Sequence, residues 1–444
     1  MKKPEDKMQK ITSLAKRRGF IFPGSEIYGG LANSFDFGPL GTELKNNIKA
    51  EWWRRFVKTR GDMVGLDAAL LMNPKTWEAS GHLGAGFADP LVECKQCHER
   101  FREDTLKKKN VCPRCGTKDS FTDTKQFNLM LKTFLGPAEE DAATVYFRPE
   151  TAQGIFVNFK NVLDTSRKRV PFGIAQIGKA FRNEITPGNF IFRMREFEQM
   201  EIEYFVRESE WEGHFERWLN EMKLWIKDLG ISEDKVHYVE IDAKDRAHYS
   251  RRTIDIEYDF PFGQKELYGL AYRADHDLKA HQEASGHDLS FTDPETGNKF
   301  IPHVVEPTFG VERTVLVAML EAYHEEEAPT SEKGETESRV VMKFPRWLAP
   351  VKVAILPLMK KEELTTMAKE LYSDLAQAFT CDYDETGSVG KRYRRQDEIG
   401  TPYCVTIDYD SLKDQAVTVR DRDAMTQERV GITELEQYLK ENLN

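Results

Sequence analysis

Two predicted strands place charged and aromatic side chains at spacings that could serve chemistry. In residues 178–184, Arg182 and Glu184 are two positions apart, so both point to the same face of an extended strand. Residues 197–206 alternate between a polar and an apolar face. The polar face carries Phe197, Gln199, Glu201 and Glu203, and the apolar face carries Met200, Ile202, Tyr204 and Val206. The apolar face should pack on a core, while the other offers a ring, an amide and carboxylates beside an Arg–Glu pair.

The simpler interpretation of such a polar face is the solvated side of an antiparallel sheet. The segment between the two strands, residues 189–196, favours a functional site instead. It adds Arg193 and Arg195, and it exposes apolar residues that have no obvious core to join.

A third group of candidate residues lies at the start of a predicted helix. Val311, Val315 and Met319 define the apolar stripe of a helix that begins near Gly310. Arg313 then lies in the first turn, where the helix dipole makes a cation mildly unfavourable. A bound anion such as a phosphate would satisfy both the arginine and the dipole. A solvated arginine is the alternative, because the penalty is small.

Four of the six cysteines have the spacing of a metal site. They form two Cys-x-x-Cys pairs with fourteen residues between the pairs, namely Cys94, Cys97, Cys112 and Cys115. In a cytosolic chain this spacing indicates structural zinc rather than disulfides. The isolated Cys381 and Cys404 are interpreted as small apolar fillers.

The elements that must position these residues can be outlined from periodicity and turn signals. A helix over about 42–59 carries an apolar stripe that suits either a core or a dimer face, and a second helix is expected over 209–229. Residues 232–300 look inserted, and the acidic residues 324–338 look like a linker. Beyond the linker, strands alternate with helices, which predicts a small α/β domain with a mixed sheet.

Composition limits the class of protein without deciding its partner. Hydrophobic residues make up 40% and charged residues 31%, and no apolar run approaches the length of a membrane span or a signal peptide. We therefore expect a cytoplasmic protein with no membrane association. The net charge of −10 neither supports nor excludes RNA, because local basic segments such as 390–395 coexist with it.

In this order, these segments resemble the three signature motifs of class II aminoacyl-tRNA synthetases, and specifically the dimeric glycyl-tRNA synthetases. Residues 38–41 with the following helix resemble motif 1, residues 181–184 with the loop to Phe197 resemble motif 2, and residues 310–313 resemble motif 3. Residues 80–82, 148–154, 198–201 and 306–310 resemble blocks particular to the glycyl enzymes. The resemblance runs from about residue 10 to the C-terminus.

The resemblance implies an α+β fold in two domains. Residues 1–335 would form a class II catalytic domain, an antiparallel β-sheet flanked by helices. A zinc-ribbon-like insertion would span 90–120, and further inserted residues would span 207–300. Residues 345–444 would form an α/β anticodon-binding domain. The family also implies a homodimer, ATP with Mg²⁺, glycine and tRNA(Gly).

The resemblance also assigns roles to single residues. Catalysis would rest on Arg182, Glu184 and Arg313. The residues implied for ATP are Arg182, Asn183, Glu184, Phe192, Arg193, Arg195, Phe197, Glu266, Leu267, Gly310 and Arg313. Either Arg193 or Arg195 would hold the triphosphate. The residues implied for glycine are Arg100, Glu150, Phe197, Gln199, Glu201, Arg273, Glu306, Thr308 and Gly310.

Two alternatives stay open at this point. One is a synthetase-like nucleic-acid-binding protein that has lost catalysis, and the other is a related synthetase for histidine, threonine or proline. The presence of Arg182, Glu184, Phe197 and Arg313 disfavours the first, and the glutamate-rich blocks disfavour the second.

Overall fold

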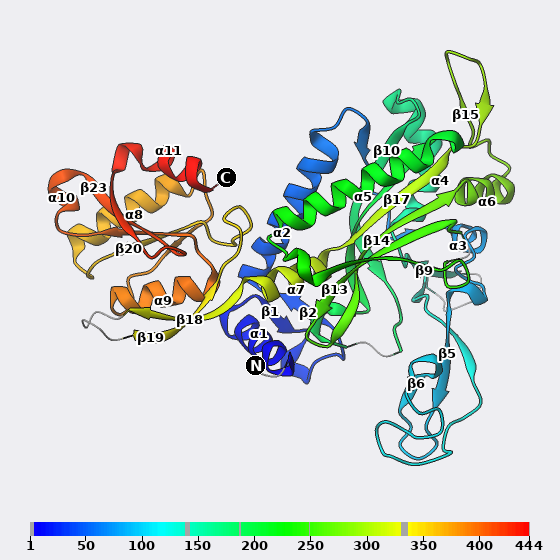
Figure 1. The fold of residues 1–444 in the computed structure, drawn as a ribbon, viewed down its shortest axis with the longest axis horizontal. Coiled ribbons are helices and arrows are strands. Elements are labelled where there is room, and N and C mark those ends of the chain that lie inside the picture. Colours follow the sequence, from blue (N-terminus) through cyan, green and yellow to red (C-terminus); the bar gives the residue numbers. More distant parts are fainter. Residues whose placement is uncertain (1–3, 138–142, 186–187, 248, 330–335, 444) are drawn as a thin grey trace.

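The computed structural model describes residues 4–137, 143–185, 188–247, 249–329 and 336–443 (Figure 1). Its centre is a seven-stranded sheet in the order β12-β13-β14-β17-β11-β10-β3. The strands are β3 (Met63–Gly65), β10 (Phe172–Phe181), β11 (Glu196–Val206), β12 (Val236–Glu240), β13 (Arg252–Phe260), β14 (Gly263–Ala274) and β17 (His303–Gly310). All neighbours pair antiparallel except β10 and the edge strand β3. The predicted antiparallel sheet is therefore confirmed.

Helices cover both faces of this sheet. On one face lie α2 (Pro39–Trp53), α5 (Trp211–Asp228) and α7 (Val311–Ala322). On the other lie α4 (Ala152–Ser166) and α6 (His276–Ser285). The apolar side chains of β11 join the first core, as the strand alternation predicts, because Met200, Ile202 and Tyr204 all belong to it.

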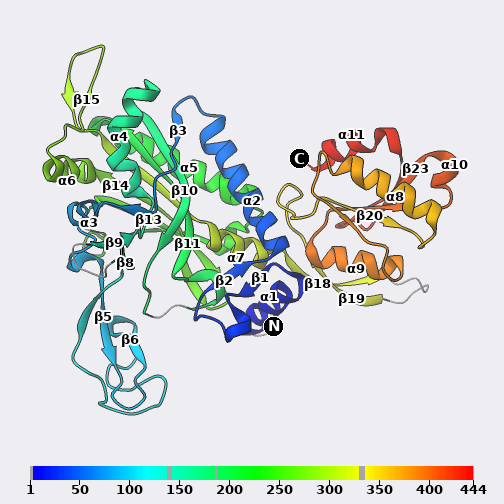
Figure 2. The ribbon, with the colours of Figure 1, turned by 180° about the vertical axis from the view of Figure 1, so that it is seen from behind.

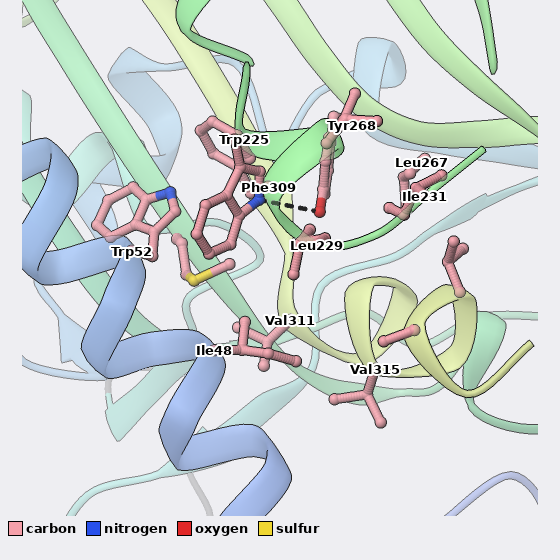
Figure 3. Close-up of a cluster of buried hydrophobic side chains, with 14 of the residues drawn as sticks. Ile48, Trp52, Trp225, Leu229, Ile231, Leu267, Tyr268, Phe309, Val311 and Val315 are labelled. Atoms are coloured by element: carbon pink, nitrogen blue, oxygen red, sulfur yellow. Dashed lines mark hydrogen bonds between the residues drawn. The ribbon is translucent and has the colours of Figure 1, made fainter. Parts of the chain in front are cut away.

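The apolar stripe of α2 is part of this first core. Ile48 and Trp52 are fully buried, and Figure 3 shows them facing Trp225, Phe309 and Val311 from the other helices and β17. The indole nitrogen of Trp225 donates a hydrogen bond of 3.2 Å to the hydroxyl of Tyr268 there. The apolar stripe of the 42–59 helix is therefore part of the core, and a dimer contact would have to use other surfaces.

The prediction that residues 207–300 are inserted is wrong for much of the segment. The strands β12, β13 and β14 are integral to the main sheet, and β14 pairs directly with β17. Polar residues such as Asp255 and Glu266 alternate with core residues on these strands and face a cavity instead of a core. Because this face is polar, the strand signal within residues 254–258 does not indicate that these strands belong to the main sheet. The small hairpin of β15 (Phe291–Thr292) and β16 (Lys299–Phe300) lies beyond them.

The cysteine-rich segment forms an arm that projects from the domain of the main sheet, as the two opposite views of Figures 1 and 2 show. Its three-stranded sheet has the order β6-β5-β7, with β5 (Ala88–Glu93), β6 (Arg100–Arg102) and β7 (Lys125–Asn128). Smaller elements lie around the main sheet. They are α1 (Pro4–Arg18), α3 (Pro74–Ala79), β1 (Ile21–Pro23), β2 (Phe35–Phe37), β4 (Leu71–Met72), β8 (Lys132–Phe134) and β9 (Thr144–Phe147).

The predicted linker is also wrong in its described part. The strands β18 (Tyr323–Pro329) and β19 (Thr336–Met342) pair antiparallel between the two domains. Two of the acidic residues that suggested a linker form ion pairs: Glu326 binds Arg339 and Lys343, and Glu325 binds Lys10. Residues 330–335 of the expected linker, and 186–187 of the turn between β10 and β11, lie outside the described residues.

The C-terminal domain is the predicted mixed sheet with helices. Its strands, in the order β21-β20-β22-β23-β24, are β20 (Val353–Pro357), β21 (Cys381–Tyr383), β22 (Tyr403–Ile407), β23 (Ala416–Asp421) and β24 (Gln427–Gly431). The helices are α8 (Glu362–Leu375), α9 (Val389–Ile399), α10 (Ser411–Asp414) and α11 (Ile432–Leu443). No helix in the described part of the chain is long and apolar enough to span a membrane.

The basic segment 390–395 lies on α9 and is mostly used inside this domain. Arg392 is buried and donates hydrogen bonds to the carbonyl oxygens of Pro357 and Leu358. Tyr393 bonds the hydroxyl of Thr406 at 2.6 Å. An RNA-facing role for the whole segment is therefore not supported, because a buried guanidinium and a paired ring are not free to contact bases.

Candidate active site

One cavity of about 490 Å³ lies over the polar ends of β11, β14 and β17, and most of the predicted site residues line it. These are Glu150, Arg182, Glu184, Phe192, Arg193, Phe197, Gln199, Glu201, Glu266, Leu267, Glu306, Thr308, Gly310 and Arg313. Register explains the convergence, since Gln199 pairs with Gly310 and Glu201 with Thr308 across β11 and β17. Residues far apart in the chain thus share one face of the sheet.

One end of the cavity is built from arginines against aromatic rings. The guanidinium of Arg182 lies 5.4 Å from the ring centre of Phe197, and that of Arg313 lies 4.5 Å from Phe192. Arg313 also forms an ion pair of 3.2 Å with Glu266. Flat rings and delocalised cations suit a planar base that carries a charged phosphate chain.

Glu184 offers an unsatisfied acceptor in this part of the cavity. Its Oε2 atom is buried and has no hydrogen-bond partner among the described residues, and the nearest cation, Nη1 of Arg193, is 4.0 Å away. A buried carboxylate oxygen without a donor is costly, so a ligand N–H would be bound favourably here.

The two arginines of the loop before β11 differ in position. Arg193 lines the cavity. Arg195 does not, and it donates to the carbonyl oxygens of Ala32 at 3.1 Å and Glu184 at 3.2 Å. Asn183 is also outside the lining, and its backbone N–H donates to the carbonyl oxygen of Leu129. Of the two arginines, Arg193 is therefore placed to meet a ligand in the cavity.

The other end of the cavity is a buried acidic floor. Glu201 is 2% exposed, and it accepts hydrogen bonds from the hydroxyls of Thr151 and, at 3.1 Å, Thr308. Glu150 accepts from Gln153 at 3.0 Å and lies 3.4 Å from the ring nitrogen Nε2 of His82. This floor combines carboxylates with hydroxyl groups and suits a small cation.

A buried arginine supports the floor from behind. Arg273 is 1% exposed and outside the cavity lining; it donates to Glu306 at 2.7 Å and to both carboxylate oxygens of Asp277 at 2.8 Å. Each of its three nitrogen atoms thus donates to a protein carboxylate, and the side chain lies behind Glu306, outside the cavity lining.

The charges of the floor are unequal. Burial favours the neutral form of Glu150, but His82 and Arg273 outweigh it and hold the pKa of Glu150 below its ordinary value. Burial raises the pKa of Glu306 to about 8 in spite of Arg273. Burial and the charge of Glu150 also raise the pKa of Glu201. More carboxylates than cations are buried here, so the empty floor attracts positive charge.

Glu203 is the next residue on the same face of β11, and no hydrogen bond from a described residue offsets the cost of burying its carboxylate. It is fully buried, neither carboxylate oxygen has a hydrogen-bond partner among the described residues, and burial and Glu306 raise its pKa well above the ordinary value. The folded protein therefore holds this proton at pH values where the unfolded chain has lost it.

Replacing Glu203 by glutamine should remove this pH-dependent cost. The stability that the raised pKa provides is fully present below the ordinary value of about 4.3 and is lost as the pH rises through the raised value. We expect Glu203→Gln to raise the melting temperature at pH 8, and this shift should exceed the shift at pH 4.5 by at least about 2 °C. Circular dichroism measures both, with the exposed Glu283→Gln as control. Equal shifts at the two pH values would contradict the assignment.

Arg100 is the fourth predicted residue outside the cavity lining, after Asn183, Arg195 and Arg273, and other residues join the lining. Arg100 is exposed on β6 and pairs with Glu93 at 3.0 Å, whereas Arg102, two positions on, lines the cavity. Tyr249 and Asp255 also line the cavity, and the ring of Tyr249 lies 3.8 Å from the guanidinium of Arg273. Strand parity in the Arg-Phe-Arg sequence does not separate Arg100 from Arg102, and Tyr249 follows no periodic pattern.

The four predicted metal ligands converge at the tip of the arm. Their sulfur atoms all lie within 4.8 Å of one another, and the pairs Cys94–Cys115 and Cys97–Cys112 are each 3.7 Å apart. All four thiols are free of disulfides. Four thiolates at about 2.3 Å from a tetrahedral zinc ion are about 3.8 Å from one another, so the cluster fits this metal.

Comparison with known proteins agrees with this geometry. Residues 135–323 match the tRNA synthetase class II core domain (G, H, P, S and T), and residues 352–442 match an anticodon binding domain. Two prolyl-tRNA synthetase structures from Cryptosporidium parvum, complexed with L-proline and AMP or with halofuginone and AMPPNP, share the fold. They have TM-scores of 0.64 and 0.66 at 15% and 16% identity, covering 98% of this chain and 77% and 74% of theirs.

The sequence relatives are closer and span nearly the whole chain. A glycine–tRNA ligase from Alkaliphilus oremlandii is 54% identical over 99% of both chains. One from Clostridium acetobutylicum is 52% identical over 99% of this chain and 100% of its own. One from Thermobifida fusca is 51% identical over 98% of both. Identity at this level over full length, together with the class II core around the cavity, shows that this chain belongs to the glycine–tRNA ligase family.

Proposed function

We propose that this chain is a cytoplasmic enzyme that activates glycine with ATP and transfers it to the 3′ end of tRNA(Gly). The observation that carries the proposal is a single cavity with arginine–aromatic pairs at one end and buried carboxylates at the other. A nucleotide fits the first end and an ammonium group the second. Exchange of pyrophosphate into ATP measures the first step, and charging of tRNA(Gly) measures the second.

Activation needs little more than position and charge. An oxygen of the glycine carboxylate forms a bond to the α-phosphorus of ATP, the bond from that phosphorus to the bridging oxygen breaks, and pyrophosphate leaves. The nucleophile is already an anion at neutral pH, so no general base is required. Positioning and neutralisation of the phosphate charge carry such a reaction, and Mg²⁺ would accompany ATP as its counter-ion.

The cavity provides groups for each part of ATP. Phe197 and Arg313 would flank the adenine, and the unpartnered Oε2 atom of Glu184 would accept the adenine amino group. Arg182 would bind the α-phosphate and Arg193 the other phosphates. Glu266 would keep Arg313 in place through their ion pair.

The acidic floor provides the glycine contacts. Glu150 and Glu201 would accept the ammonium, and Thr308, which already donates to Glu201, would fill the space where a larger side chain would project. We assign Arg273 a supporting role through Glu306, because each of its nitrogen atoms donates to a protein carboxylate and it lies outside the cavity lining. Glycine offers no side chain to bind, so selectivity would come from excluding larger amino acids.

We also propose that the four cysteines bind one structural zinc ion. Protein purified without chelator is expected to contain about one zinc per chain, because the four sulfurs are already set at tetrahedral spacing. Elemental analysis measures it, and the Cys112→Ser/Cys115→Ser variant is expected to contain less than a tenth of that amount. Four titratable thiols and no zinc in the parent protein would contradict the site.

A homodimer formed through the 38–60 region and the preceding loop completes the proposal. Ile27 and Tyr28 are each 87% exposed between β1 and β2, close in sequence to α2, whose own stripe is buried. We expect light scattering to give the mass of two chains and expect Ile27→Asp/Tyr28→Asp to weaken association, since charge would be buried at an apolar contact. A parent protein that is active as a stable monomer would contradict the dimer.

A further inference from the structure

A buried histidine behind the acidic floor has no role in the function proposed above. His82 follows α3, is 6% exposed and does not belong to the cavity lining. Its Nε2 atom lies 3.4 Å from Glu150 Oε2, and its Nδ1 atom lies 2.7 Å from the hydroxyl of Ser80. A connected row of side chains thus runs from Ser80 through His82 to a carboxylate that faces the cavity.

The ring of His82 is fixed in orientation. It meets Trp77 edge-on with the ring centres 5.6 Å apart, and Phe87 with the centres 4.8 Å apart. Its backbone carbonyl accepts a hydrogen bond of 2.9 Å from Asn128. Because packing prevents the imidazole from rotating, Nε2 stays directed at Glu150.

The hydrogen-bond pattern places a proton on Nε2. If the Ser80 hydroxyl donates to Nδ1, the ring hydrogen is on Nε2; if the ring is protonated, both nitrogens carry hydrogen. The remaining tautomer would put two acceptors face to face at 3.4 Å. In either favourable arrangement, His82 donates to Glu150.

The other oxygen of Glu150 is held from a different side. Gln153 donates to Oε1 at 3.0 Å, and Gln153 is itself held by Asp277 and by His281 at 3.0 and 2.7 Å. Each carboxylate oxygen of Glu150 therefore has one protein partner and keeps acceptor capacity for a ligand. Glu150 is fixed in place more completely than Glu203, which has no partner among the described residues.

We propose that His82, oriented by Ser80, is a positioning residue that holds Glu150 in the geometry that receives the glycine ammonium. The inference rests on the proposed function, since it takes Glu150 as an ammonium acceptor. The same residue types occur in hydrolase triads, but here the order is reversed. Glu150 faces the cavity while Ser80 is buried outside the cavity lining, so Ser80 has no access to a substrate as a nucleophile.

Glutamine and asparagine substitutions distinguish this role from packing alone. The glutamine amide can reach the position of Nε2, whereas the shorter asparagine amide reaches only that of Nδ1. We expect His82→Asn to raise the KM for glycine by about tenfold, because a binding group loses affinity when the residue that orients it is removed. The KM for ATP should stay within about twofold, and His82→Gln should restore the glycine KM to within about threefold. The surface substitution His287→Asn is the control and should change neither.

A double-mutant cycle then tests whether His82 acts through Glu150. If it does, His82→Asn should add less than about twofold to the loss already caused by Glu150→Gln. Independent losses that multiply would overturn the inference, as would equal effects of His82→Asn and His82→Gln on both substrates. If Glu150→Gln itself leaves glycine activation unchanged, the glycine site proposed above is wrong and the inference falls with it. If Glu150→Gln is impaired and His82→Asn is normal, only the role of His82 is wrong.

Discussion

The substitution Arg182→Ala is expected to lower the kcat of glycine-dependent pyrophosphate exchange by roughly 10²–10³-fold, the usual cost of losing a group that stabilises transition-state charge. Nε of Arg182 donates to the carbonyl oxygen of Pro149 at 3.0 Å, which fixes the side chain. No described residue accepts a hydrogen bond from its two Nη groups, although the side chain lines the cavity. These two NH₂ groups are suited to the phosphate oxygens that gain charge as the bond to pyrophosphate breaks.

The kinetic pattern distinguishes this role from simple binding. An interaction made mainly in the transition state lowers kcat more than it raises KM. Arg182→Lys should recover only part of the loss, since a point charge cannot reproduce the planar guanidinium against Phe197. The exposed Arg169→Ala, which loses only a surface ion pair with Glu295, should exchange normally. An Arg182→Ala enzyme with the parental kcat would remove the residue from the reaction.

The second large effect is expected at the acidic floor. Glu201→Gln should lower the kcat/KM for glycine at least about tenfold, equivalent to about 1.4 kcal/mol at the transition state. The carboxylate is almost inaccessible to solvent and contacts only neutral hydroxyl and amide groups of the described residues, so it offers its charge to a ligand in a dry site. Glutamine keeps the shape and removes that charge.

The matched control is Glu203, which lies two residues further along the same strand. Glu203 is buried on the same face but lies outside the cavity lining, and burial and Glu306 raise its pKa well above the ordinary value. Glu203→Gln should therefore change the kcat/KM for glycine by less than about threefold at pH 7. If Glu201→Gln were as active as the parent, the assignment of the amino-acid pocket would be wrong. A loss of equal size in both variants would show that the floor responds to shape rather than charge.

The central site was predictable because strand alternation is a strong constraint. Once β11 was recognised, parity alone assigned Glu201 to a polar face and Met200 to the core, and the structure agrees. Arg313 was singled out because it breaks the helix-dipole rule, and it does line the cavity. These inferences depend on local geometry that the chain cannot easily change.

The errors come from residues whose partners are distant in sequence. The acids of 324–338 suggested a linker, but Arg339 and Lys10 pair with Glu326 and Glu325, and the described residues of the segment lie in paired strands. Strands β12–β14 looked inserted because one face lines the cavity. The basic residues on α9 kept an RNA partner open, yet Arg392 donates to carbonyl groups of its own domain. Sequence periodicity records whether a side chain is polar, and it does not record which distant group satisfies it.

The central claim is that the cavity activates glycine, and pyrophosphate exchange with each of the twenty amino acids tests it most directly. The crowded, acidic floor predicts that glycine alone supports rapid exchange, that alanine is at least about tenfold poorer in kcat/KM, and that proline, threonine and histidine give none above background. The enzyme should then transfer the activated glycine to tRNA(Gly). Absence of exchange with glycine under conditions that preserve the fold, or exchange with proline or threonine as rapid as with glycine, would contradict the account.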